Sequence, residues 1–172
     1  MESQRPRIDS RAFTKAANDY LAVTSPDHDQ TSLQIGLVLV RAANQFVQES
    51  EQRAQRPFGL RWSGLSATFA LALFHAVEAS TLARLTGITR QAMSQVTRTL
   101  ERDGLVRRTA GGDRRSHPLE LTATGWQAVA GALERQGEIS DEWFASLDDE
   151  ERSTLYRLLE KVIEGGARRA PR

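Results

Sequence analysis

The chain has 172 residues, enough for one domain with a sizeable apolar core, and its 40% hydrophobic content is typical of soluble globular proteins. It contains no cysteine, which excludes a disulfide framework, a thiolate metal site and a thiol redox sensor. The N-terminus is polar and the strongest apolar run, Leu37 to Val40, is far too short to span a bilayer. We therefore expect a cytoplasmic protein without a signal peptide or membrane segment.

The formal net charge of +1 conceals an uneven distribution. Residues 84–117 contain eight arginines and three acidic residues, a net charge of +5. Residues 118–164 contain four basic and eleven acidic residues, a net charge of −7, and the chain before Arg84 is balanced. A basic block inside a nearly neutral chain indicates where a polyanion would bind.

The first 30 residues are predicted to form an N-terminal arm. After a polar start, Ser10 is a candidate cap for a short amphipathic helix over residues 11–22. Its apolar side is made by Ala12, Phe13, Ala16, Ala17, Tyr20 and Leu21. This side must pack somewhere, either on its own subunit or on a second one.

Residues 31–60 are predicted to contain a long helix, capped by Thr31 or Ser32, reaching about Gln55 and stopped by Pro57. Its first half is apolar on nearly every side, through Leu33, Ile35, Leu37, Val38, Leu39 and Val40. A small domain offers one core-facing side only, so a partner chain is expected to cover the other. The alternative is a central core helix in a monomer.

Residues 61–121 begin with a predicted helix from Trp62 or Ser63 to His75 and a second, capped by Ser80, over residues 81–85. Gly87 suits the turn that follows. Thr89 is then a good N-cap for a helix that runs to Asp103 and is closed by Gly104. Whether a minor strand forms near Val77 is left open.

Two faces are predicted for the helix that follows Thr89. Met93, Val96, Thr97 and Leu100 recur at helical spacing and form an inward stripe. The opposite face is polar, has no acidic residue and carries donors suited to base edges or phosphates: Arg90, Gln91, Ser94, Gln95 and Arg98. The alternative is a solvated surface helix.

A hairpin is predicted next, with strands at residues 105–109 and 118–122 around a basic tip. The tip contains Asp113, Arg114, Arg115 and His117. Two adjacent arginines on a hairpin suit a wing that touches the DNA backbone or enters a minor groove. Asp113 is expected to hold one of these arginines in place, because an unpaired carboxylate there would repel DNA.

Residues 122–165 are predicted to form two C-terminal helices. The first starts at Thr122 or Thr124 and continues, with a kink near Gly137, to Phe144. The second starts in the acidic run 148–151, where carboxylates favour a helix N-terminus, and ends at Gly165-Gly166. Its apolar stripe is Leu155, Leu158, Leu159 and Val162. Residues 166–172 form a basic tail.

Residues 80–125 resemble the winged helix-turn-helix of the MarR family of bacterial transcription regulators. The matching features are LARLTGI, LERDGLV, the Asp113-x-Arg115 of the wing, and LELTATG after it. The likeness extends more loosely to residues 31–165, although the link between His75 and Ala79 is shorter than the family's. The resemblance implies a mainly α fold with a small β-hairpin wing and long terminal dimerisation helices. It also implies a homodimeric regulator, generally a repressor, that binds a near-palindromic operator in double-stranded DNA through Thr89 and the polar residues of the helix and wing named above.

The resemblance further implies a small aromatic or phenolic effector, held between the first long helix, the next helix and the helix after the wing. Trp62, Phe69, Phe74, His75 and Trp126 are the residues predicted to line such a pocket. The alternative is that they belong to the apolar core. Because cysteine is absent, the peroxide-sensing branch of the family is excluded.

No enzymatic chemistry, cofactor or metal site is predicted. The three histidines, His28, His75 and His117, are too scattered for a triad or a metal cluster, and no phosphate-binding glycine loop occurs. Asp27-His28-Asp29 is interpreted as a solvated linker. Two rival hypotheses are a winged helix that binds proteins without DNA, and a small-molecule-binding protein.

Overall fold

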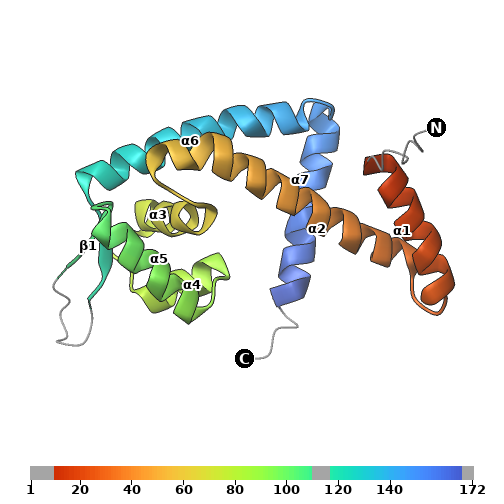
Figure 1. Cartoon of the computed structure of the whole chain (residues 1–172), viewed down its shortest axis with the longest axis horizontal. Helices are drawn as coiled ribbons and strands as arrows, with labels where there is room; N and C mark the ends of the chain where they lie inside the picture. The colour runs from red at the N-terminus through yellow and green to blue at the C-terminus, as the bar shows by residue number, and fades with distance from the viewer. Residues whose placement is uncertain (1–9, 110–116, 168–172) are drawn as a thin grey trace, which may run out of the picture. The chain divides into compact units, whose positions relative to one another are not determined.

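The computed structural model describes residues 10–109 and 117–167 (Figure 1). Most of this part is helical, and its sheet is a single two-stranded antiparallel pair. The chain divides between Gln48 and Glu49 into two compact units. This division falls inside the long helix predicted for residues 31–60. None of the described helices combines the length and apolar character that a membrane span requires.

The first unit contains α1 (Ser10–Thr24) and most of α2 (Gln30–Ser50), which agree with the predicted helices to within a few residues at their starts. Thr31 and Ser32 are not the cap of α2. The carboxylate of Asp29 accepts the amide of Ser32 at 2.8 Å. The hydrogen bond from the Ser32 hydroxyl, followed by that from the Ser32 amide, lowers the pKa of Asp29. Asp29 fills the cap role because its side chain accepts an amide that the helix itself leaves unpaired.

The predicted arm helix packs on α2 of its own chain. The Arg41 guanidinium donates to the Thr14 hydroxyl at 3.1 Å and lies 5.1 Å from the centre of the Phe13 ring. Much of the unit's apolar surface nevertheless remains exposed, namely at Phe13, Tyr20, Val23, Ile35, Leu37, Val38, Leu39 and Val40. The alternative of a central core helix in a monomer is therefore wrong, and coverage of the exposed side of α2 by a partner chain stays a prediction.

The second unit begins with a change of helix type. The α-helix ends at Ser50, five residues before the predicted end, and continues as a π turn, η1 (Glu51–Gln55), and a 3-10 turn, η2 (Arg56–Phe58). Pro57 lies inside η2, where its missing amide prevents continuation of the α-helix. The helical path then ends at Gly59, whose φ of 71° is a conformation that favours glycine.

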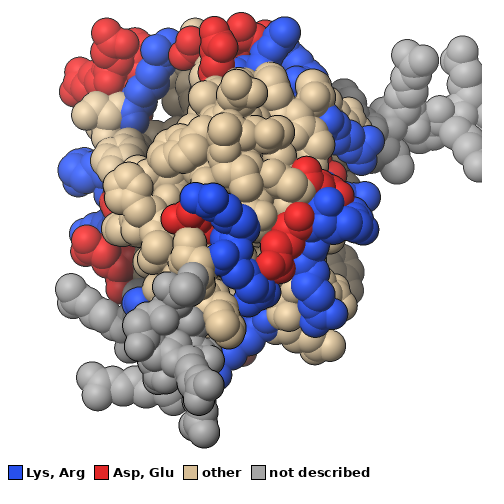
Figure 2. Space-filling view, turned by 90° about the vertical axis from the view of Figure 1, so that its left-hand side faces the viewer, with Lys and Arg blue, Asp and Glu red and all other residues tan. Residues whose placement is uncertain are grey.

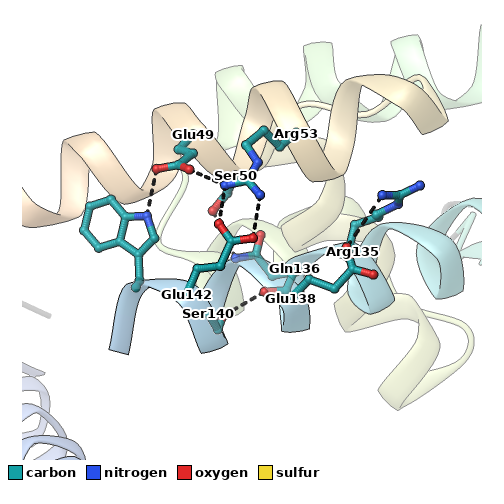
Figure 3. Close-up of polar contacts among 9 residues, drawn as sticks. Glu49, Ser50, Arg53, Arg135, Gln136, Glu138, Ser140 and Glu142 are labelled. Carbon is teal, nitrogen blue, oxygen red and sulfur yellow. Dashed lines mark hydrogen bonds and ion pairs between the residues drawn. The ribbon is translucent and has the colours of Figure 1, made fainter. Parts of the chain in front are cut away.

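Polar contacts join the π turn to α6 (Ala123–Phe144), as Figure 3 shows. The Arg53 guanidinium donates to both carboxylate oxygens of Glu142, at 2.7 and 2.8 Å, and also binds Glu49. The Trp143 indole donates to Glu49 at 2.8 Å. The bond from Trp143, followed by that from Arg53, lowers the pKa of Glu49, and Arg53 lowers that of Glu142. Because these groups are exposed, the pairs fix the register of the two segments more than they stabilise the fold.

The apolar core of the second unit is built around α3 (Trp62–Phe74). This helix contacts α4 (Ala79–Thr86), α5 (Arg90–Arg102) and α6, and in Figure 1 it lies between α6 and the α4–α5 pair. The start of α4 differs from the prediction. Glu78 occupies the N-cap position, and the Ser80 hydroxyl lies inside the helix and donates to Glu78.

The predicted hairpin forms between β1 (Val106–Arg108) and β2 (Leu119–Leu121), with Val106 opposite Leu121. A further bridge answers the question left open near Val77. Val77 and Leu119 exchange two backbone hydrogen bonds, of 3.0 and 2.9 Å, and both side chains are buried. The base of the hairpin is therefore attached to the core on two sides.

The last two helices start largely as predicted. Thr122 caps α6 by accepting the amide of Gly125 at 3.0 Å, and α6 runs through Gly137 without interruption. The start of α7 (Asp149–Ala167) is a capping box in which Asp148 and Glu151 each accept the other's amide. The prediction that Gly165-Gly166 ends this helix is wrong, because α7 includes both glycines.

Two glycines of α6 provide a matched test of this packing. A Cβ at Gly125 would lie 1.9 Å from the Leu105 carbonyl oxygen, whereas a Cβ at Gly137 would meet nothing within 4 Å. We expect Gly125→Ala to lower the free energy of unfolding by about 1–3 kcal/mol or more, because backbone must move. Gly137→Ala should raise it by about 0.5–1 kcal/mol through helix propensity. Urea unfolding at one fixed protein concentration measures both, and equal effects would contradict the close approach at Gly125.

Candidate nucleic-acid interface

Helix α5 forms as the sequence predicts, and the core fixes its orientation. The Thr89 hydroxyl accepts the amide of Ala92 at 3.2 Å, and Gly104 ends the helical path with a φ of 71°. Met93, Thr97 and Leu100 are buried, and Val96 packs partly against the same core. The predicted inward stripe is thus confirmed, and the opposite side of α5 must face away from the core.

The five polar residues predicted for the outer face of α5 lie on that side. Arg90, Gln91, Gln95 and Arg98 are exposed, and Ser94 is half-buried. The Arg98 guanidinium donates to the Ser94 hydroxyl at 3.0 Å, which extends it along the helix surface. Thr89 is exposed, but its hydroxyl oxygen is occupied as the cap. The helix therefore presents a row of hydrogen-bond donors.

Part of the predicted wing lies outside the described residues, namely Asp113, Arg114 and Arg115. His117, where the described chain resumes, is exposed. At the base of the hairpin, Arg107 donates to Glu120 at 2.6 Å and Arg108 donates to Glu101 at 2.9 Å. These two arginines were counted in the basic block, but their charges are already paired.

The basic block therefore contains two kinds of arginine. Arg102, Arg107 and Arg108 each form an ion pair with a neighbouring carboxylate. Within residues 10–109 and 117–167, no carboxylate pairs with Arg84, Arg90 or Arg98. Figure 2, which shows the left-hand end of Figure 1, has basic side chains gathered in its lower half with acidic ones between them. Glu101 and Asp103 are already subtracted in the net charge of +5, so only the pair of Arg107 with Glu120, which lies outside the block, lowers this charge further, to +4.

No DNA contact was predicted from the segment at the start of α3, yet this segment lies beside α5. Gly59, Leu60, Arg61, Ser63 and Gly64 line one side of an open hollow of about 450 Å³, and α5 lines the other. Arg61 lies outside the basic block, which begins at Arg84. The sequence offers only a weak signal that Arg61 belongs to the interface, because it is a single arginine before an apolar helix.

The residues predicted to line a ligand pocket are all at least partly exposed, with Trp62 36%, Phe69 42%, Phe74 57% and Trp126 44% accessible. His75 is also exposed and has a φ of 61°. Trp62 and Phe74 are the first and last residues of α3, so their backbones lie about 18 Å apart along the helix. One small ligand therefore cannot contact both.

The hollows elsewhere in the second unit have other linings. One of about 280 Å³ between α6 and α7 is lined by Ser140, Asp141, Phe144, Arg152, Leu155, Tyr156 and Leu159. The hollow beside α5 likewise includes none of the five residues. In the part of the chain that the structure describes, no group of three or more His, Asp or Glu side chains is arranged to hold a metal ion.

Comparison with known proteins places this geometry in a family. The model of the MarR family matches residues 69–116, which include α4 and α5. The HTH-type transcriptional regulator YwaE of Bacillus subtilis is 27% identical over 134 residues, which make up 77% of this chain and 78% of YwaE. The M. tuberculosis transcriptional regulator MosR, solved in complex with DNA, is 30% identical. That match has a TM-score of 0.63 and covers 78% of this chain and 97% of MosR.

A third similar structure is BpsR of Bordetella bronchiseptica, whose DNA binding is regulated by 6-hydroxynicotinic acid. It has a TM-score of 0.68 and 24% identity, over 75% of this chain and 98% of BpsR, and at this identity the likeness shows the fold alone. The match to MosR covers nearly all of that relative, and the MarR model matches the segment that contains the exposed polar helix. This chain belongs to the MarR family of DNA-binding transcription regulators.

Proposed function

We propose that the protein is a homodimeric repressor that binds a near-palindromic operator and is released by a small aromatic acid. The observation that carries the DNA-binding part is the outer face of α5. It exposes Arg90, Gln91, Gln95 and Arg98 on a helix whose other side is fixed in the core. A helix of this kind fits the major groove of B-DNA, and its N-terminal residues reach the base edges. The DNA complex of MosR supports this proposal.

Within this proposal, reading and positioning fall to different residues. Gln91, Gln95 and Arg98 carry base recognition, because amide and guanidinium groups form bidentate bonds with adenine and guanine. Arg114 and Arg115 of the wing contribute sequence-independent affinity through phosphates or the minor groove. His117 contacts the backbone beside them, and Asp113 holds a wing arginine in place.

The homodimer is proposed from the apolar surface of both units. Five apolar side chains of α2 are between 40% and 60% exposed, and α7 exposes Tyr156, Leu158, Leu159, Val162 and Ile163. Apolar surface on this scale is costly in water, and a second copy covers it by burying the same patches on both chains. A two-fold dimer presents two α5 helices to half-sites about one helical turn apart, roughly 10 base pairs.

Repression and its release by a ligand are proposed from the shared fold. The fold shared with BpsR makes a small aromatic acid the class of effector to test. Trp62 and Phe69 lie seven residues apart on one side of α3 and, with Trp126, are the residues proposed to contact it. Phe74 and His75, at the other end of α3, would belong to a different contact. A ligand changes DNA affinity only by its different affinities for the two dimer shapes.

The division between reading and positioning is testable with the intergenic DNA beside the protein's own gene, titrated against random DNA. Gln91→Ala or Gln95→Ala should narrow the gap between the two affinities by about 1–3 kcal/mol, because a base contact is lost. Arg115→Ala should weaken both by similar factors and reduce the salt slope by about 0.9 for each wing of the proposed dimer that loses a phosphate contact. If Arg115→Ala left both affinities unchanged at low and moderate salt, the wing assignment would be wrong.

The dimer is testable by sedimentation at micromolar concentration, where the wild type should sediment as a stable dimer. Val162→Glu should shift it towards monomer, because the charge enters the apolar stripe of α7. Lys161→Glu introduces the same side chain on a polar position of the same helix and serves as the control. A wild type that remained monomeric would contradict the proposal.

Ligand control is testable by screening aromatic carboxylates for quenching of tryptophan fluorescence, followed by measurement of operator affinity. An effector should lower that affinity by about 5- to 150-fold, which is the range of typical coupling energies. Trp62→Phe and Trp126→Phe identify the quenched residue. A compound that binds tightly and leaves operator affinity unchanged is not an effector, and a broad screen without any effector would argue against ligand control.

A further inference from the structure

The hollow beside α5 lies next to the residues that we propose contact DNA. The α5 side of its wall includes Gln95, Thr99 and Arg102, all of which are exposed, and the other side includes Arg61 and Ser63 from the start of α3. Gln95 is a proposed base contact, so the hollow borders the DNA-facing side of α5. It runs along the length of the helix, from Ile88 and Ala92 to Arg102 and Asp103.

The charges around this hollow are mostly compensated. Arg102 donates to both carboxylate oxygens of Asp103, at 2.9 and 3.4 Å. Arg56 lies 3.7 Å from Glu51, whose other oxygen accepts the Trp62 amide at 3.3 Å. The first amide of α3 therefore already has an anionic partner, and the helix end is not itself the binding group.

Arg61 differs from these arginines. It is exposed, and among the described residues no carboxylate lies within ion-pairing distance of its guanidinium. A guanidinium without a carboxylate partner can donate up to five hydrogen bonds, in a planar arrangement that suits a phosphate. It lies across the hollow from a helix that faces DNA.

We propose that Arg61 binds a backbone phosphate of the DNA strand that borders the major groove occupied by α5. The inference rests on the proposed docking of α5. The groove is about 12 Å wide and a helix with its side chains is about 10–12 Å across, so the phosphates on either edge pass close to the flanks of the helix. The hollow of about 450 Å³ lies along one of these flanks, and Arg61 lies on the side of the hollow opposite α5.

In this role Arg61 fixes the position of the protein on the duplex and carries no sequence information. A phosphate contact contributes equally to operator and random DNA and releases bound counterions. The recognition surface is thereby extended from the α5 helix and the wing to a third segment, in which Arg61 lies 23 residues before Arg84, the start of the basic block. Arg61 is a positioning residue, distinct from the base-reading Gln91 and Gln95.

The test compares full-length wild type, Arg61→Gln, Arg61→Lys and Arg157→Gln on a random-sequence duplex and on the intergenic duplex, over a series of salt concentrations. Arg157 is the matched control, because it is exposed on α7 and has no carboxylate partner in the described part of the chain. Arg61→Gln should weaken binding to both duplexes by the same factor, roughly 3- to 10-fold near 0.15 M salt, and reduce the salt slope by about 0.9 for each protomer of the proposed dimer whose Arg61 contacts a phosphate. Arg61→Lys should keep the slope, and Arg157→Gln should behave as wild type.

The possible outcomes separate the inference from the proposed function. If wild type binds both duplexes and Arg61→Gln keeps the wild-type slope, the phosphate contact is wrong while the DNA-binding function stands. If Arg61→Gln changes the ratio of the two affinities more than the affinities themselves, Arg61 reads bases and the positioning role is wrong. If wild type shows no salt-dependent binding to either duplex, the proposed docking of α5 fails and the inference fails with it.

Discussion

The geometry of the DNA-reading region depends on one junction, where the end of α5, the base of the hairpin and the start of α6 meet. The Thr122 hydroxyl donates to the Gly104 carbonyl at 2.6 Å while its oxygen accepts the Gly125 amide at 3.0 Å. The backbone of Gly125 lies so close to the Leu105 carbonyl that a single added carbon would overlap it. Thr122 and Gly125 therefore set the angle between α5 and α6, the helix that follows the wing.

The packing of α5 on the core explains why this helix can expose so many polar groups. Its inner face is fixed by Met93, Thr97 and Leu100 against α3, so the outer face needs no contact with the rest of the chain. The carboxylates near α5 form ion pairs with arginines close to them. Glu101, Asp103 and Glu120 each hold a neighbouring arginine, which leaves the arginines of the outer face unpaired within the described residues. Neutralising some arginines in this way directs the remaining positive charge to one side of the helix.

The apolar side chains of α2 and α7 that the single chain leaves exposed support the proposed homodimer. Burial of apolar side chains is the main favourable contribution to folding, and about half of the surface of several side chains in these helices remains accessible. In the proposed homodimer, in which two α5 helices bind two half-sites, the same apolar surface would set the separation of the two helices. Stability and DNA affinity would then be linked through one interface.

The sequence by itself determined the helix α5, its cap, its closing glycine and its two faces, because each depends on residues within a few positions of one another. It also determined the hairpin and most helix starts, through caps and alternation that are equally local. It missed the π turn after Ser50, where η1 packs against α6, and the cap at Asp29, whose carboxylate competes with the hydroxyls of Thr31 and Ser32. It also missed the continuation of α7 through Gly165-Gly166, which no contact in the described part of the chain explains. Only the tertiary structure decided which arginines are paired, because those partners come from other elements or from side-chain directions that spacing does not specify. It also brought Arg61 beside α5, since the contact between the start of α3 and the end of α5 follows from how the helices pack around Leu60 and Leu100.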